Sequence, residues 1–241
     1  KSYNLFKVLE KKVKKKKSIK FINNSKTNFY NSIIKNKSDF DLVINFSENN
    51  KISKEIFFKR QVKNYNSIAY TTIINHKKCD NRIAYQVFSK LGPIAFLPCS
   101  NSQTSIVLSL LKKNKEINEN EVIELIHNYN KKYFIKSFSG FEKFNLQGSL
   151  LKNYYYKNIL CFGDNIHKIH PLAGQGLNMT IRDIKILSSL IDQKIDLGLS
   201  LDHSILNEFQ SQTKHYNYLY ASSIDLINEF FKLDNKFNNT Y

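Results

Sequence analysis

The sequence predicts an α/β protein in which an antiparallel β-sheet is inserted into a unit that combines strands and helices. The apolar run at residues 159–162 is typical of a strand buried on both faces, and Gly163-Asp164 ends it. The triplet Gly174-Gln175-Gly176 then opens a helix. Three further runs are dense in β-branched and aromatic residues and predict the inserted sheet: 67–75, 83–88 and 104–111.

The first sixty residues predict a helix, a basic turn and strand material. Leu5, Val8, Leu9 and Val13 recur at helical spacing. The lysines that follow, up to Lys17, could form a nucleic-acid patch, but cations are also favourable at a helix C-terminus, which is the simpler explanation. Strand material is expected from Ile19, Phe21, Leu42, Val43 and Ile44.

A further helix is predicted from residue 118 to about residue 133. Asn118 and Glu121 have the spacing of a capping box at its start. Its apolar stripe consists of Val122, Leu125, Ile126, Tyr129 and Tyr133. The inserted sheet before this helix is divided by turn signals at 76–82, 91–93 and 98–103.

The helix that follows Gly174 is the most informative element. Glycines in its first turn allow backbone N–H groups to approach a ligand, and the helix start carries partial positive charge, so an electron-rich ligand is expected there. Its predicted buried stripe is Leu177, Ile181, Ile184, Leu187 and Ile191.

After a turn at Gly198, a long helix from Ser204 is predicted to cover this unit, and residues 233–241 are expected to fray. Its apolar positions are Leu206, Phe209, Leu219, Ile224, Ile227 and Phe231.

The stretch from Gly163 to Asp183 carries a family resemblance. Its matching residues, in register, are Gly163, Asp164, His167, His170, Pro171, Gly174, Gln175, Gly176, Asn178 and Asp183. The pattern resembles the second FAD fingerprint of the flavin-dependent aromatic hydroxylases, and it is most similar to the ring hydroxylases of ubiquinone biosynthesis. A second segment, 84–98, also resembles these enzymes through Gly92, Pro93, Ala95, Leu97 and Pro98.

Two departures from the family pattern are visible. Asn165, Ile166 and Thr180 stand where the family has small residues. Ser47-Glu48 stands where the family has an Asp-Gly pair after a strand, which weakens the expectation of full activity.

The resemblance implies an incomplete Rossmann-like FAD-binding domain with an inserted antiparallel β-sheet substrate domain. The implied parts are a partial FAD-binding domain at 1–60, the substrate domain at 61–145, and the FAD-binding continuation with a C-terminal helix at 146–241. The family opens with a Gly-x-Gly-x-x-Gly turn that holds the ADP half of FAD. None of the seven glycines here has that spacing, and residue 1 is not Met, so we expect the front of the domain to be missing.

The implied activity is an FAD-dependent monooxygenase that uses NAD(P)H and molecular oxygen to hydroxylate a phenolic ring, prenylated or not. The residues implied to bind the cofactor are Gly163, Asp164, Pro171, Gly174, Gln175, Gly176, Leu177 and Asn178. Asp164 is expected to accept hydrogen bonds from the ribityl hydroxyls, and Asp183 to matter much less. His167 and His170 are expected to fix the loop, and no catalytic residue is assigned.

A metal site and a nucleophile site were the chemical alternatives. His167 and His170 lie three residues apart with Asp164 nearby, but Pro171 makes this stretch a loop, and no third histidine has zinc-like spacing. A Gly-x-Ser-x-Gly elbow is absent from the sequence. We therefore expect neither a metal nor a serine nucleophile.

The net charge of +17 comes from 37 basic and 20 acidic residues, scattered along the chain without a recognised nucleic-acid motif. Nucleic acid is therefore not expected as a partner, whereas a membrane surface and a ubiquinone-biosynthesis complex are.

Cys79, Cys99 and Cys161 lack a C-x-x-C pair, which favours a cytoplasmic protein, with peripheral contact at the inner membrane as a further option. The competing functions are a degenerate, non-catalytic paralogue that acts as a partner in a biosynthetic complex, and a basic protein that binds nucleic acid or membrane surfaces.

Overall fold

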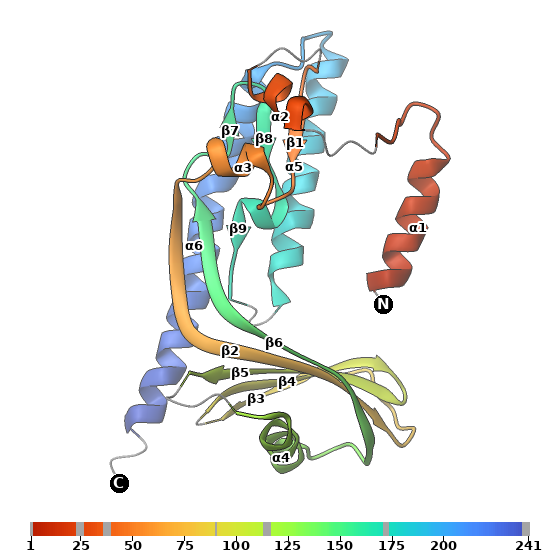
Figure 1. Ribbon diagram of the computed structural model, residues 1–241, viewed down its shortest axis with the longest axis vertical. Helices are drawn as coiled ribbons and strands as arrows, with labels where there is room; N and C mark the ends of the chain where they lie inside the picture. Colours follow the sequence, from red (N-terminus) through yellow and green to blue (C-terminus); the bar gives the residue numbers. More distant parts are fainter. Residues whose placement is uncertain are drawn as a thin grey trace. The chain divides into compact units, whose positions relative to one another are not determined.

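The computed structural model describes residues 2–22, 27–35, 40–89, 91–112, 117–170 and 174–237, and the chain divides into two compact units, Lys1–Ser38 and Asp39–Tyr241. The first unit holds helices α1 (Ser2–Lys14) and α2 (Thr27–Ile34) (Figure 1). The helix predicted from Leu5, Val8 and Leu9 is confirmed by α1, although all three side chains are more than half exposed. Ile19 and Phe21 were expected in a strand, but they lie outside any strand and are exposed. The sequence did not predict α2.

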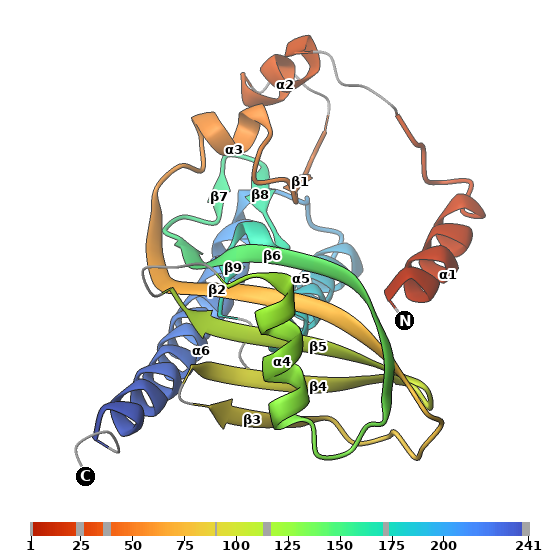
Figure 2. The ribbon, with the colours of Figure 1, turned by 60° about the horizontal axis from the view of Figure 1, so that its bottom comes forward.

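The second unit contains a six-stranded antiparallel sheet in the order β3-β4-β5-β2-β6-β9. Its strands are β2 (Arg60–His76), β3 (Tyr85–Ser89), β4 (Gly92–Ser100), β5 (Gln103–Leu111), β6 (Ile135–Leu151) and β9 (His167–Lys168). Helix α4 (Glu119–Tyr129) covers one face of this sheet (Figure 2). Val122 and Ile126 of α4 pack on a core that includes Ile94, Phe96 and Ile106, all completely buried.

The start of α4 confirms the predicted capping box. The Asn118 side chain accepts a hydrogen bond from the Glu121 backbone N–H at 3.0 Å, and the Glu121 carboxylate accepts one from the Asn118 N–H at 2.7 Å. The helix ends at Tyr129, four residues before the expected end, because the Asn130 side chain turns the chain by donating to the carbonyl oxygen of Tyr133 at 2.6 Å. Tyr133 still packs on the sheet core.

Three strands of the large sheet were not predicted: β4, β6 and the short β9, which lies in a stretch that was expected to be a loop. The turns predicted at 91–93 and 98–103 are present, between β3 and β4 and between β4 and β5, but they are shorter than expected, because β4 includes both Pro93 and Pro98. Pro93 is the second residue of β4, and Pro98 lies beyond the last residue pair with β3, where β4 is paired with β5 alone. Strand positions of this kind tolerate a proline that has no N–H to donate. Strand β6 has no clear apolar alternation, so its sequence gives only a weak strand signal.

A smaller sheet of order β1-β8-β7 carries the buried strand predicted at 159–162. Its strands are β1 (Val43–Asn45), β7 (Tyr155–Tyr156) and β8 (Ile159–Cys161), with β1 parallel to β8. Ile159, Leu160 and Cys161 are completely buried, which confirms the prediction. Phe162 follows them and stacks on Phe209 with ring centroids 5.6 Å apart.

Four helical elements surround this smaller sheet: α3 (Lys51–Glu55), the 3-10 helix η1 (Gly163–Asn165), α5 (Gly176–Asp196) and α6 (His203–Phe237). The predicted turn between the last two is confirmed, and Gly198 occupies it at φ +64°. The expected fraying at 233–241 is wrong for residues 233–237, which belong to α6, and the last four residues lie outside the described part. Leu206, Phe209 and Ile224 of α6 are buried, whereas Leu219 and Ile227 are exposed. Within the described ranges, no helix combines the length and apolarity needed to span a bilayer.

Candidate functional site

Five of the eight residues implied to bind a cofactor line one pocket of about 580 Å³: Gly163, Asp164, Gly174, Gly176 and Leu177. The pocket lies where β8 ends, η1 begins and α5 starts, so residues separated by a dozen positions in the sequence meet at one place. Its volume is within the range of small-molecule sites. Pro171, another implied binding residue, lies outside the described residues.

The N-terminus of α5 is open toward a ligand. Gln175 occupies the N-cap position without a side-chain hydrogen bond to the helix, and the first turn contains no acidic residue. The first N–H groups of a helix have no partner within the helix, so a bound electron-rich group would satisfy them. A Cβ added at Gly174 or Gly176 would meet no atom within 4 Å, so neither glycine is required by packing. Gly174, at φ +61°, is required by its backbone conformation.

The two remaining implied residues, Gln175 and Asn178, are placed at the helix start rather than on the pocket wall. The Asn178 side-chain amide donates a hydrogen bond to the Gln175 side-chain oxygen at 3.2 Å, and Asn178 is exposed. Their backbone groups belong to the first turn of α5 and its cap. A contribution through backbone N–H groups, which the resemblance implies for this segment, stays a prediction.

Opposite α5, the end of β8 forms the second wall. Phe162 is buried, and Gly163 turns the chain at φ +64°. The next residue, Asp164, is exposed in η1 and lines the pocket, where its carboxylate can accept hydrogen bonds from hydroxyl groups of a ligand. Phe46, which follows β1, contacts Phe162 edge to face at 5.5 Å and also lines the pocket. The site therefore combines an aromatic wall, one acidic side chain and a helix start.

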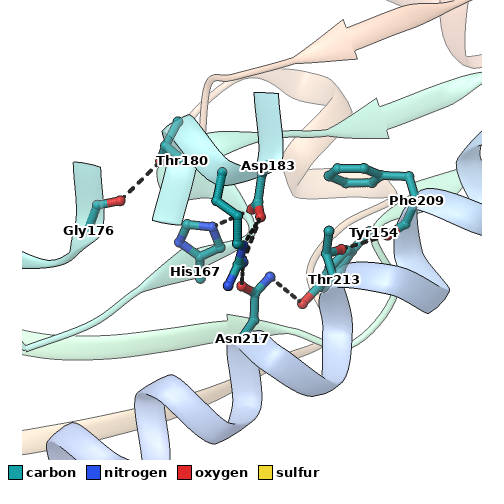
Figure 3. A network of polar contacts seen from close by, with 9 residues as sticks. Tyr154, His167, Gly176, Thr180, Asp183, Phe209, Thr213 and Asn217 are labelled. Carbon is teal, nitrogen blue, oxygen red and sulfur yellow. Dashed lines mark hydrogen bonds and ion pairs between the residues drawn. The ribbon is translucent and has the colours of Figure 1, made fainter. Parts of the chain in front are cut away.

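Behind the pocket, a buried polar network joins β9, α5 and α6 (Figure 3). His167 lines the pocket, and its Nε2 lies 2.8 Å from Asp183 Oδ2, with both side chains completely buried. Arg182 donates to the other carboxylate oxygen, Asp183 Oδ1, at 2.6 and 3.1 Å, and also to the side-chain oxygen of Asn217. The Asn217 amide then donates to the hydroxyl of Tyr154 at 3.1 Å. Burial raises the pKa of this tyrosine, which therefore stays neutral.

The network overturns the predicted buried stripe of α5. Leu177, Ile181 and Ile184 are at least half exposed. Among the five predicted positions, only the Leu187 side chain is less than one tenth exposed. The residues that α5 buries are Met179, Asp183, Leu187 and Leu190. A carboxylate can occupy that face because it is paired with His167 and Arg182. A pattern search for apolar residues excludes an aspartate and therefore selects the wrong face.

His170, the other histidine of the motif, makes a different contact. It is 1% exposed, lines the pocket, and meets the ring of Tyr65 edge to face, with ring centroids 4.7 Å apart. His167 and His170 thus contact different partners, Asp183 and Tyr65, rather than converging on one point. Among the described residues, no three His, Cys, Asp or Glu side chains form a group suited to a metal ion.

Two of the positions that depart from the family pattern, Asn165 and Ser47, belong to a second polar network. Asn165 is completely buried, and its amide lies within hydrogen-bond distance of Ser53 Oγ at 3.1 Å and Cys161 Sγ at 3.2 Å. Arg60 donates to the backbone oxygen of Asn165 at 2.8 Å and to its side-chain oxygen. The backbone oxygen of Ser47 accepts from Ser53 Oγ at 2.5 Å. Ser47 is thus held by hydrogen bonds directly after β1, at the place given to it from the sequence.

The chain is similar to known proteins in both sequence and structure. A family model described as an FAD binding domain matches residues 46–196. The ubiquinone biosynthesis monooxygenase COQ6, mitochondrial, of Dictyostelium discoideum is 27% identical over 184 residues, which cover 61% of this chain and 37% of that protein. The Caenorhabditis elegans protein of the same name is 23% identical over 215 residues, which cover 71% and 48%. The chain thus spans less than half of these two relatives.

Among solved structures, a similar one is the crystal structure of PqsL, a probable FAD-dependent monooxygenase from Pseudomonas aeruginosa. The TM-score is 0.61 at 18% identity, and the match covers 81% of this chain and 57% of PqsL. At this identity the likeness concerns the fold. It supports the predicted α/β fold, an FAD-binding domain with an inserted antiparallel sheet.

Proposed function

The chain belongs to the family of FAD binding domains, and from this premise we propose that it is part of a flavin-dependent monooxygenase that hydroxylates a phenolic ring. The observation that carries the proposal is the pocket at the start of α5, which lies within the matched range and is lined by Gly163, Asp164 and Gly176. The names of two relatives, ubiquinone biosynthesis monooxygenases, support the reaction type, and the resemblance of the Gly163–Asp183 stretch motivates the substrate class, an aromatic ring that is prenylated or not.

The pocket residues fit the chemistry of FAD. The open α5 start offers backbone N–H groups and partial positive charge, which would stabilise negative charge on a reduced flavin. Asp164, exposed at the rim, would accept hydrogen bonds from ribityl hydroxyls. When bound, FAD supplies the electron transfer and oxygen chemistry, with NAD(P)H as the proposed electron donor. The aromatic wall of Phe46 and Phe162 would limit water around the ring.

The test uses the purified natural protein. We expect a yellow protein with bound FAD that oxidises NAD(P)H in the presence of a phenol and oxygen, and a phenol product heavier by one oxygen atom in the mass spectrum. Bound FAD without turnover would support instead the non-catalytic partner of a biosynthetic complex, which the Ser47-Glu48 departure motivates. A protein that binds no FAD would refute the proposal.

We also propose contact with an anionic membrane surface, and a cytoplasmic location at the inner membrane, because a prenylated phenol resides in the bilayer. The net charge of +17 supports this, since each basic residue near an anionic surface contributes about 1 kcal/mol. In a flotation assay, the protein should rise with anionic vesicles at low salt and stay behind at high salt. Equal recovery with neutral and anionic vesicles at all salt concentrations would refute the membrane contact.

A further inference from the structure

Tyr65 lies in an irregular segment of β2 that the proposed function does not use. The β2–β6 register jumps from Asn64 to Ile68 on one strand but only from Gln147 to Asn145 on the other, so residues 65–67 of β2 face a single residue of β6. Within this bulge Asn66 has a positive φ of 49°, which is uncommon for a residue with a side chain. Bulges of this kind bend a strand and redirect its side chains.

The bulge directs Tyr65 toward two elements outside the sheet. Its hydroxyl donates a hydrogen bond to Asp225 Oδ1 of α6 at 2.8 Å, and its ring lies against His170 of the pocket. Lys63 completes the cluster, with its Nζ 3.1 Å from Asp225 Oδ2. Tyr65 is 5% exposed, so it connects the sheet, the C-terminal helix and the pocket inside the protein.

The titration behaviour of Tyr65 agrees with this position. Burial and then the hydrogen bond to Asp225 raise the pKa of the Tyr65 hydroxyl, while a hydrogen bond from the backbone of His170 lowers it in part. The hydroxyl is therefore neutral at physiological pH and can donate to Asp225 while its oxygen accepts from the backbone of His170.

Gly148 of β6 shows how closely the tyrosine is held. A Cβ added at Gly148 would lie 2.7 Å from the Tyr65 hydroxyl oxygen and 3.3 Å from two ring carbons. Gly148 does not have a positive φ, so its backbone conformation does not require glycine. Glycine is required there because the Tyr65 ring approaches the backbone closely.

We propose that Tyr65 is a positioning residue for the cofactor pocket: it holds His170, which lines the pocket, at a fixed distance from α6. This inference rests on the proposed function, because it assigns Tyr65 a role in FAD binding. Asp225 anchors the tyrosine from α6, and Gly148 leaves the space that it needs.

The test is the dissociation constant of FAD for the purified natural protein and its variants, measured by flavin fluorescence. Tyr65→Phe keeps the ring but loses the hydroxyl, and the loss of hydrogen bonds that hold the site should raise the dissociation constant about 5- to 10-fold. The visible spectrum of the bound flavin should change as well, which a purely structural role would not produce. Tyr85→Phe is the matched control, because Tyr85 is a sheet tyrosine whose buried hydroxyl has no hydrogen-bond partner in the described part.

A double-mutant cycle makes the test specific. Gly148→Ala should weaken FAD binding by pushing Tyr65 away, and it should weaken it little further in the Tyr65→Phe protein. If Gly148→Ala does not fold, Asp225→Ala replaces it in the cycle. Independent, multiplicative effects, or a Tyr65→Phe protein that binds FAD as tightly and with the same spectrum as the natural protein, would overturn the inference while leaving the proposed function intact. A natural protein that binds no FAD would instead overturn both.

Discussion

Replacing Asp183 by alanine is the perturbation with the largest effect expected from the structure. The change removes the acceptor of one hydrogen bond from His167 and two from Arg182. Removing one partner of a buried pair costs about 3–5 kcal/mol, because the other partner is left without compensation in the interior. The Arg182 side chain is 28% exposed and can turn to water, whereas His167 cannot. We therefore expect the lower end, about 3 kcal/mol.

For a protein of this size, about 3 kcal/mol corresponds to a fall in the melting temperature of roughly 6–12 °C. The assay is thermal unfolding of the purified natural protein, followed by circular dichroism. Asp192→Ala is the matched control, because it makes the same chemical change at an exposed position of the same helix. Asp183→Asn should fall between the two, since its amide oxygen still accepts from His167. If Asp183→Ala and Asp192→Ala melt together, the network does not stabilise the fold and this reasoning is refuted.

Three further predictions concern the pocket and its surroundings. Asp164→Ala should weaken FAD binding about 10- to 150-fold, because a hydrogen bond to a charged acceptor contributes roughly 1.5–3 kcal/mol; flavin fluorescence measures this, and Asp192→Ala should leave it unchanged. Burial raises the pKa of Cys161 from 9.0 to about 12, so the stability that its neutral thiol contributes is complete below about pH 9 and is lost as the pH rises toward 12. Cys161→Ala should therefore flatten the decline of the urea midpoint between about pH 9 and pH 11, and Cys99→Ala should not. Asn165→Ala should lower the free energy of unfolding, measured in urea, by about 2–4 kcal/mol, because buried partners lose their hydrogen bonds. A smaller decrease than the one caused by replacing an exposed asparagine with alanine would contradict this prediction.

The sequence predicted the parts of the site that a local string specifies. A continuous apolar run, a stop at Gly163-Asp164 and glycines before a helix describe β8, η1 and the start of α5 without reference to the rest of the chain. The capping box at Asn118 is equally local, and it was predicted as the structure has it. Local signals of this kind follow from backbone conformation and hydrogen bonding within a few residues.

The side chains that support the pocket were not predicted, because they come from distant parts of the sequence. Tyr65 and Asp225 are 160 residues apart, and no spacing rule connects them. Asp183 was expected to matter much less than Asp164 for FAD affinity, which stays a prediction, but no local pattern indicated that α5 turns its carboxylate inward to His167. Only the three-dimensional arrangement shows that the buried side chains of Tyr65 and Asp183 have hydrogen-bond partners, and hydrophobic periodicity cannot find them.

The departures from the family pattern are best understood as one coupled set. A buried asparagine at position 165 is unfavourable by itself, because its amide must find hydrogen-bond partners. In the structure, the Asn165 amide donates to Ser53 Oγ, and the Ser53 hydroxyl donates to the backbone oxygen of Ser47. Arg60 donates to the backbone oxygen of Asn165. Asn165 and the backbone oxygen of Ser47 thus share Ser53 as a hydrogen-bond partner beside β1, and none of these three residues lines the pocket. Ser47-Glu48 follows β1 whereas the open helix start belongs to α5, so the two features have to be tested separately: FAD binding reports on the helix start, and turnover reports on residues 47–48.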